Sequence, residues 1–123
     1  MKYVDGFVLV IPKGNLPAYQ DMAQKAGQVW KEYGALEYIE SVGEDLSPDV
    51  PAEMKGIPFP QMIRAKPGET VVFSFIVYKS REHRDEVNAK VMKDPMMSNM
   101  DNKQMPFDMK RMAYGGFKVI VEA

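Results

Sequence analysis

The stretch Thr70-Val-Val-Phe-Ser-Phe-Ile-Val-Tyr78 decides the fold, because this apolar run predicts a strand and the pattern of a helix follows directly at Ser80–Lys93. A last strand is predicted at Gly116–Val121. The first half of the chain has the same order, with a strand at Tyr3–Ile11, a helix at Asn15–Tyr33 and a strand at Leu36–Val42. Two successive strand–helix–strand units predict an α+β, ferredoxin-like βαββαβ sandwich, in which two helices cover one face of a four-stranded antiparallel sheet.

Local signals mark the ends of the two predicted helices. We expect Asn15 to cap the first helix, Pro17 to sit in its first turn, and Gly34 to supply the left-handed residue after its end. Ser80 is expected to cap the second helix. Trp30 lies on the apolar stripe of the first helix, which indicates a core residue more than a platform for a cofactor.

Two irregular stretches connect these elements. Glu44–Pro67 contains five prolines, so we expect a surface excursion with a short edge strand near Gln61–Ala65. Seven of the eleven methionines fall between Met92 and Met112. Methionine fills irregular gaps and also lines adaptable binding surfaces, and here gap filling beneath a long loop is the favoured interpretation over a ligand lid.

The predicted strands are apolar on both faces. In an isolated ferredoxin-like sandwich one face of the sheet meets water, and its strands alternate apolar and polar residues. Phe7–Ile11 and Val71–Tyr78 do not alternate in this way. The sequence therefore predicts a homodimer whose sheets pack face to face into a barrel-like core. The alternative is a monomer in which the loop Leu46–Pro67 covers that face.

Composition excludes several classes of site. A chain of 123 residues predicts one domain over residues 1–123, and the absence of cysteine excludes disulfides and thiolate chemistry. One histidine excludes a multi-histidine metal centre within a subunit, so we expect neither metal nor cofactor. Net charge is −1, and bases and acids alternate along the second helix, which disfavours nucleic acid as a partner. No signal peptide or bilayer-spanning segment is recognisable, so a cytoplasmic location is expected.

The candidate site residues are polar side chains in apolar surroundings, because no strong catalytic motif is present. Asp5 shares one face of the first strand with Phe7, where a buried carboxylate needs a cation, and Arg111 is its expected partner. An exposed aspartate near the start of a strand is the equally weighted alternative. His83 is a candidate general base or ligand-orienting donor, although a surface histidine is the commoner case.

The remaining candidates offer oxygen atoms. Tyr78 and Tyr114 lie at strand and loop ends, where their hydroxyls can bind a small molecule. Ser74 is a hydroxyl inside an apolar strand, which more often bonds to the backbone than acts as a nucleophile. Asp108 is expected to cap or brace a turn.

Several blocks of this sequence resemble the YbaA-like bacterial proteins, a family of unknown function. The blocks, which span the chain almost end to end, are Met1–Val8, Lys31–Glu37, Thr70–Phe75, Arg84–Pro95, Met105–Asp108 and Lys110–Phe117. The resemblance implies a dimeric α/β-barrel protein with a pocket between the sheet and its helices. The chain departs from the family pattern at Ser47–Pro60, which is longer and richer in proline.

The resemblance does not by itself decide the function. The superfamily includes cofactor-free monooxygenases, dehalogenating and isomerising enzymes, haem-degrading enzymes and plain ligand binders. We therefore favour a homodimeric protein that binds a small apolar ligand, or a cofactor-independent enzyme, with its pocket between sheet and helices. The alternatives are a non-enzymatic homodimeric interaction protein that uses the methionine-rich loop 92–112 and, third, an RNA-associated protein.

Overall fold

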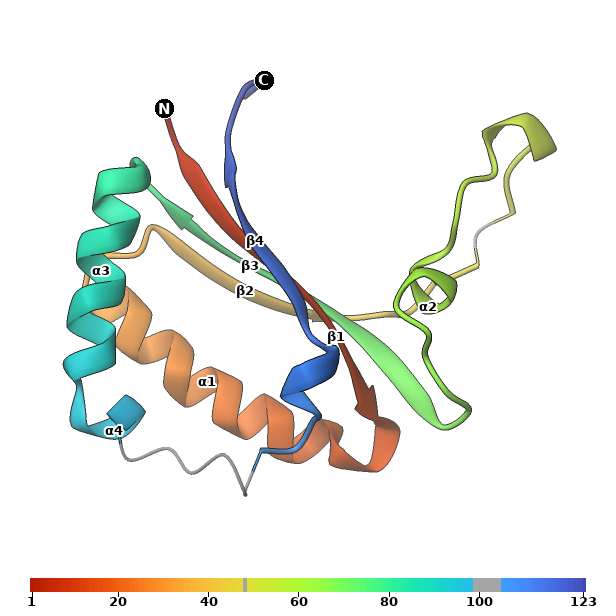
Figure 1. Cartoon of the computed structure of the whole chain (residues 1–123), viewed down its shortest axis with the longest axis horizontal. Helices are drawn as coiled ribbons and strands as arrows, with labels where there is room; N and C mark the ends of the chain where they lie inside the picture. Colours follow the sequence, from red (N-terminus) through yellow and green to blue (C-terminus); the bar gives the residue numbers. More distant parts are fainter. Residues whose placement is uncertain (48, 99–104) are drawn as a thin grey trace.

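The computed structural model describes residues 1–47, 49–98 and 105–123 and has one four-stranded sheet with its two long helices on one side of it (Figure 1). Its helices and strands follow the predicted order. They are β1 (Tyr3–Pro12), α1 (Leu16–Glu32), β2 (Glu37–Val42), α2 (Phe59–Met62), β3 (Glu69–Tyr78), α3 (Arg81–Lys93), α4 (Pro95–Ser98) and β4 (Ala113–Lys118).

The sheet has the strand order β2-β3-β1-β4, and every neighbouring pair is antiparallel. Its two central strands come from the starts of the two strand–helix–strand units. Helices α1 and α3 lie side by side against the same face (Figure 1). This arrangement confirms the ferredoxin-like α+β sandwich that the sequence predicts.

The last strand was predicted three residues too late. It runs over Ala113–Lys118 and not over Gly116–Val121. Register explains the difference, because Ala113 lies opposite Val8 while Lys118 lies opposite Tyr3, where β1 begins. Beyond Lys118 one more backbone hydrogen bond, from the N–H of Val119 to the carbonyl of Lys2, lies just outside the start of β1.

The edge strand expected near Gln61–Ala65 is also wrong, because a short helix, α2, lies there. The N–H of Met62 donates to the carbonyl of Pro58, and Pro60 lies in the first turn, where a fixed φ favours a helix. Arg64 then ends the turn with a φ of 57°. A left-handed residue cannot continue a strand.

The helix ends follow the sequence signals at two of three positions. The Ser80 hydroxyl accepts a hydrogen bond from the N–H of His83 at 3.1 Å, as a capping residue should. Gly34 has a φ of +114°, which confirms the left-handed exit from α1. Asn15 occupies the capping position, but its side chain donates to the carbonyl of Pro106 and makes no capping bond.

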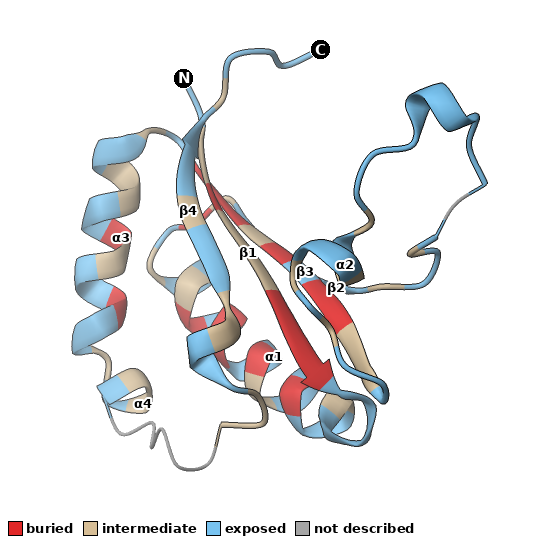
Figure 2. Ribbon diagram, turned by 45° about the vertical axis from the view of Figure 1, so that its right-hand side comes forward, coloured by how far each residue is buried: buried red, intermediate tan, exposed pale blue. Residues whose placement is uncertain are grey.

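Two clusters of buried side chains form the core beneath the helices (Figure 2). One is centred on Tyr78 and includes Val87 and Val91 of α3, while the other is centred on Leu9 and includes Tyr19 of α1. The indole of Trp30 packs against the first cluster, in agreement with its interpretation as a core residue.

The outer face of the sheet is apolar at its centre. Strand register places these side chains on it: Val4, Val8, Ile39, Phe73, Phe75, Val77 and Phe117. Ile39 and Phe73 remain 42% exposed and Phe117 61% exposed. Phe59 of α2 packs edge-on against Phe73, so the proline-rich excursion covers part of this face and leaves the rest open.

Candidate functional site

A cavity of about 510 Å³ lies between the sheet, α1 and α3. It draws its walls from both core clusters and from the methionine-rich segment that precedes β4. Apolar and aromatic side chains dominate the lining, among them Phe7, Leu9, Met22, Ala26, Trp30, Ile76, Met97, Met105, Phe107 and Met112. The polar groups are few, and most of them belong to two hydrogen-bonded sets.

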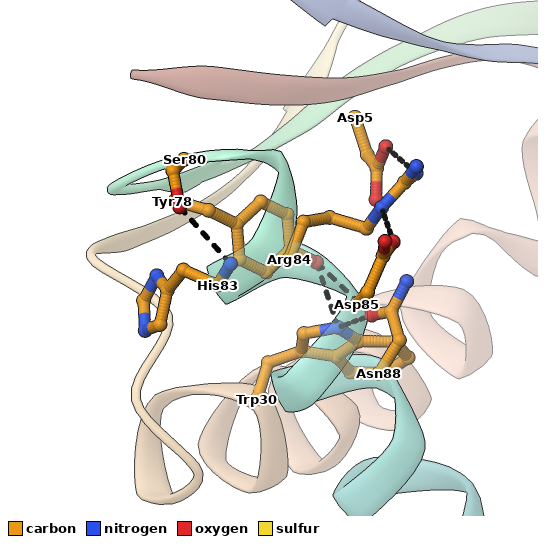
Figure 3. A network of polar contacts seen from close by, with 8 residues as sticks. All are labelled: Asp5, Trp30, Tyr78, Ser80, His83, Arg84, Asp85 and Asn88. Carbon is orange, nitrogen blue, oxygen red and sulfur yellow. Dashed lines mark hydrogen bonds and ion pairs between the residues drawn. The ribbon is translucent and has the colours of Figure 1, made fainter. Parts of the chain in front are cut away.

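The first polar set contains a buried ion pair (Figure 3). Nη1 of Arg84, on α3, donates to Oδ1 of Asp5, on β1, at 2.7 Å. Side-chain exposure is only 19% for Arg84 and 10% for Asp5. Burial raises the pKa of Asp5 above its usual value, and the nearby charge of Arg84 opposes that rise without cancelling it. The guanidinium is held further by Asp85 and lies 4.9 Å from the centre of the Tyr3 ring.

Three further side chains, those of Trp30, Tyr78 and Asn88, extend the first polar set toward α1. Nε1 of Trp30 donates to the Tyr78 hydroxyl and to Oδ1 of Asn88, at 3.1 Å each. The Tyr78 hydroxyl in turn donates to Oδ1 of Asn88 at 3.2 Å (Figure 3). Burial, and next the charge of Asp5, raise the pKa of Tyr78, so the phenol stays protonated and remains a donor.

The second polar set is centred on Glu40 of β2. Its two carboxylate oxygens accept hydrogen bonds from the hydroxyls of Tyr19 and Tyr38, both at 2.7 Å. Burial, followed by the charge of Glu40, raises the pKa of both phenols. Gly27 makes room for this arrangement, because a Cβ at that position of α1 would lie 2.6 Å from the Tyr38 ring.

Four of the seven candidate residues line the cavity. Asp5, Ser74, Tyr78 and Tyr114 do so, whereas His83, Asp108 and Arg111 do not. Asp5 is 7% exposed, which decides between the two alternatives in favour of the buried carboxylate. Ser74 is 5% exposed at the centre of β3, and Tyr114, 75% exposed, lies at the rim on β4.

The expected pairing of Asp5 with Arg111 is wrong. Asp5 lies opposite Gly116 in the β1–β4 ladder, and Arg111 comes five residues before Gly116, or about 17 Å along an extended chain. Arg111 instead forms a two-pronged pair with Glu69, with nitrogen–oxygen distances of 2.7 and 2.9 Å. Asp108 accepts a hydrogen bond from the N–H of Lys110, and so braces the turn before β4 as expected.

The Glu69–Arg111 pair makes a testable contribution to acid stability. Hydrogen bonds from Arg111, and next from the N–H of Lys66, hold the pKa of Glu69 at about 2, below its usual 4.5. A lowered pKa stabilises the fold above pH 4.5, and that stabilisation is lost as pH falls toward 2. We expect Glu69→Gln to flatten the decline of the free energy of unfolding over this range, measured by urea titration.

Glu53→Gln is the matched control for this measurement, because Glu53 is exposed in the proline-rich excursion. The control variant should retain the acid dependence of the wild type. If Glu69→Gln retains it as well, the pair makes no such contribution.

His83 lies apart from the cavity at the start of α3. Its Nδ1 accepts a hydrogen bond from the N–H of Lys79 at 3.0 Å, and its ring packs edge-on against Tyr78. A Cβ on Gly34 would lie 3.4 Å from Nε2. The imidazole therefore lies between the end of β3 and the end of α1 and packs against the Tyr78 ring.

Sequence reasoning missed Arg84, Asn88 and Glu40. Arg84 and Asn88 are four residues apart on α3, and this spacing, together with Val87 and Val91, was a signal that both face the sheet. Glu40 follows Tyr38 by two residues in a strand, so both side chains point to the helix-covered face. A charged residue at a strand position whose side chain points to the helix-covered face was the signal that could have identified Glu40.

The methionines near α4 divide between the core and the cavity wall. Met96 and Met97 pack against the core cluster of Tyr78, and Met105 and Met112 line the cavity. Met92, in contrast, is 58% exposed. Part of the methionine-rich loop 92–112, including Met100, lies outside the described residues.

Over residues 1–47, 49–98 and 105–123, no group of three or more histidine, cysteine, aspartate or glutamate side chains is arranged to hold a metal ion. In the same part of the chain, none of the helices has the length and hydrophobicity needed to cross a membrane.

Residues 2–109 match a family model described as "Protein of unknown function (DUF1428)". The chain is 46% identical over 122 residues to the uncharacterized protein YbaA of Escherichia coli K12, with 99% of each chain covered. The YbaA protein of Shigella flexneri matches to the same extent. The YbaA-like resemblance is thereby confirmed.

Solved structures of low sequence identity share the fold. A dimeric ferredoxin-like protein from an uncultured marine organism aligns over the whole of both chains with a TM-score of 0.59 at 14% identity. An uncharacterized NIPSNAP domain protein from Burkholderia xenovorans has a TM-score of 0.58 at 12% identity, covering 98% of this chain and 97% of that one. Rv0793 from Mycobacterium tuberculosis has a TM-score of 0.57 at 13% identity, covering 100% and 99%.

Proposed function

Because the chain belongs to the DUF1428 family, whose function is unknown, we propose a function from its own cavity: a homodimeric protein that binds a small, largely apolar molecule between the sheet and its helices. The observation that carries the proposal is the cavity of about 510 Å³. Small-molecule sites occupy about 300–1,000 Å³ and combine apolar walls with a few placed polar groups.

The lining supports a ligand with a flat or flexible apolar body. Trp30, Tyr38 and Phe107 offer aromatic surfaces, and methionines such as Met97 and Met105 adapt their shape to what they contact. The polar atoms around Asp5 are hydrogen-bonded among themselves, and so are those around Glu40, so both sets are held in place by the protein. Such a pocket is preorganised for binding.

The homodimer is proposed from the outer face of the sheet. Phe73, Phe117 and Ile39 expose a large share of their apolar surface there, at the positions around the central strands. A second copy packed sheet to sheet would remove this surface from water. The ferredoxin-like structure from a marine organism is described as dimeric, which supports the same assembly for this chain.

A cofactor-independent enzyme is the second candidate, and Asp5 favours it. Its carboxylate lines the cavity, and burial raises its pKa, the direction that makes a carboxylate a stronger base. Arg84 occupies one of its oxygens, so a reacting ligand would have to approach the other. Binding is the more general conclusion, because it requires only the cavity.

Native mass spectrometry of protein taken directly from cells tests the proposal in one measurement. We expect a mass of two subunits and a retained small molecule. Ala26→Leu adds volume to a buried residue of the lining and should abolish retention of the ligand, while Ala18→Leu, exposed on the same helix, should not. A wild-type monomer without ligand, or retention by Ala26→Leu, would contradict it.

A further inference from the structure

The charged groups that line the cavity do not balance. Within residues 1–47, 49–98 and 105–123 they are Asp5, Arg84 and Glu40. Arg84 is engaged by Asp5 at 2.7 Å and by Asp85 at 2.8 Å, so its charge is already neutralised. No lysine or arginine among residues 1–47, 49–98 and 105–123 pairs with Glu40, whose contacts are the two neutral phenols. The lining contributed by the described residues therefore carries one carboxylate in excess.

The two tyrosines that donate to Glu40 each lie beside a second aromatic ring. The Tyr38 ring lies 5.9 Å from that of Trp30, and the Tyr19 ring lies 5.6 Å from that of Phe107. All four rings line the cavity. The faces of such rings attract a cation within about 6 Å, and tryptophan and tyrosine do so most strongly. A carboxylate hydrogen-bonded to two members of these ring pairs combines the two features that attract an organic ammonium ion.

Glu40 also lies at the boundary between two hollows. A groove of about 800 Å³ runs between α1 and β2, and it shares Tyr19, Ala23, Tyr38 and Glu40 with the inner cavity. On the groove side α1 presents Gln20, Gln24 and Gln28, one residue in four and thus on one face of the helix. A ligand can thus place a charged nitrogen at Glu40 and its apolar body in the inner cavity.

We propose that this cavity binds an organic ammonium ion with an apolar or aromatic body, and that Glu40 recognises the charged nitrogen. The proposal rests on the small-molecule function proposed above and specifies the class of its ligand. Each carboxylate oxygen has two acceptor positions, so Glu40 can accept from the ammonium while it keeps both phenol hydrogen bonds. A carboxylate ligand would meet the excess negative charge and be disfavoured.

Three probes with one skeleton separate charge from shape: 4-phenylbutylamine, 4-phenylbutan-1-ol and 4-phenylbutanoate. Their affinities can be measured at neutral pH by titration calorimetry and by the fluorescence of Trp30, the only tryptophan, which lies on the cavity wall. We expect the amine to bind about tenfold more tightly than the alcohol, and the carboxylate more weakly than either.

Glu40→Gln keeps the shape of the side chain and removes its charge. We expect this variant to bind the amine and the alcohol with affinities within about twofold of each other. Glu37→Gln is the matched control, because Glu37 belongs to the same strand but faces the opposite side of the sheet, and it should keep the preference of the wild type. Circular dichroism verifies that both variants fold.

The possible outcomes test the ammonium site separately from the more general function of binding a small molecule. If the wild-type protein binds the alcohol and the amine equally well, the ammonium site is refuted while small-molecule binding stands. If Glu37→Gln loses the preference as fully as Glu40→Gln, recognition by Glu40 is refuted. If no probe binds the wild-type protein, both the ammonium site and the proposed function are refuted. Should Glu40→Gln fail to fold, the ranking of the three probes on the wild type still decides the ligand class.

Discussion

Replacement of Arg84 by methionine is expected to lower the free energy of unfolding by about 3 kcal/mol at pH 8. Methionine keeps most of the length of the side chain but leaves the carboxylate of Asp5, 10% exposed, without its cation. An unpaired buried charge costs far more than the pair itself contributes. Urea unfolding of the variant and the wild type measures the difference.

The loss of unfolding free energy in Arg84→Met should become smaller as pH falls. Arg84 lowers the pKa of Asp5, so its removal lets burial raise that pKa further. A raised pKa means that the folded variant takes up a proton more readily than the unfolded chain, and the penalty disappears once Asp5 is protonated. The same titration at pH 8 and in mild acid therefore gives a larger deficit at pH 8.

Two further variants identify the cause of the stability lost in Arg84→Met. Arg81→Met changes an exposed arginine of the same helix and should cost little. The double variant Asp5→Asn/Arg84→Met has no stranded carboxylate and should recover part of the stability lost in Arg84→Met. An equal deficit at both pH values would show that lost packing, and not the unpaired charge of Asp5, destabilises the variant.

Replacement of Phe75 by glutamate is expected to convert the proposed dimer into a folded monomer. Phe75 lies opposite Gly6 in β1 and Ile39 in β2, so it occupies the middle of the outer sheet face. A charge buried there without a partner costs several kcal/mol, and we expect the dissociation constant to rise at least about a thousandfold. Size exclusion with light scattering at micromolar concentration measures the change.

The fold of the monomer should survive this substitution, because the new carboxylate meets water once the partner is gone. Circular dichroism should show unchanged secondary structure. Met54→Glu is the control, since Met54 is 73% exposed and belongs to the proline-rich excursion, whose far end projects away from the sheet (Figure 1). A dimeric Phe75→Glu variant, or a monomeric wild type, would contradict the sheet-to-sheet interface.

Patterns within each segment were enough to predict the architecture. The runs Tyr3–Ile11 and Thr70–Tyr78 became the two central strands, and the signals at Gly34 and Ser80 set the ends of helices correctly. These features depend on residues up to about four positions apart, where side-chain direction follows directly from the period of a helix or strand. The apolar character of both sheet faces was readable for the same reason.

Only the tertiary structure decided which polar groups meet. Asp5 and Arg84 are 79 residues apart, and Tyr19 and Glu40 are 21 apart, so their contacts depend on how β1 aligns with β3 and β4 and on how the helices cross the sheet. That alignment cannot be inferred from residues that are close together in the sequence. The burial of Asp5 was one of two equally weighted alternatives, and its partner was assigned to Arg111, because a one-dimensional pattern indicates a charge in apolar surroundings without its neighbour.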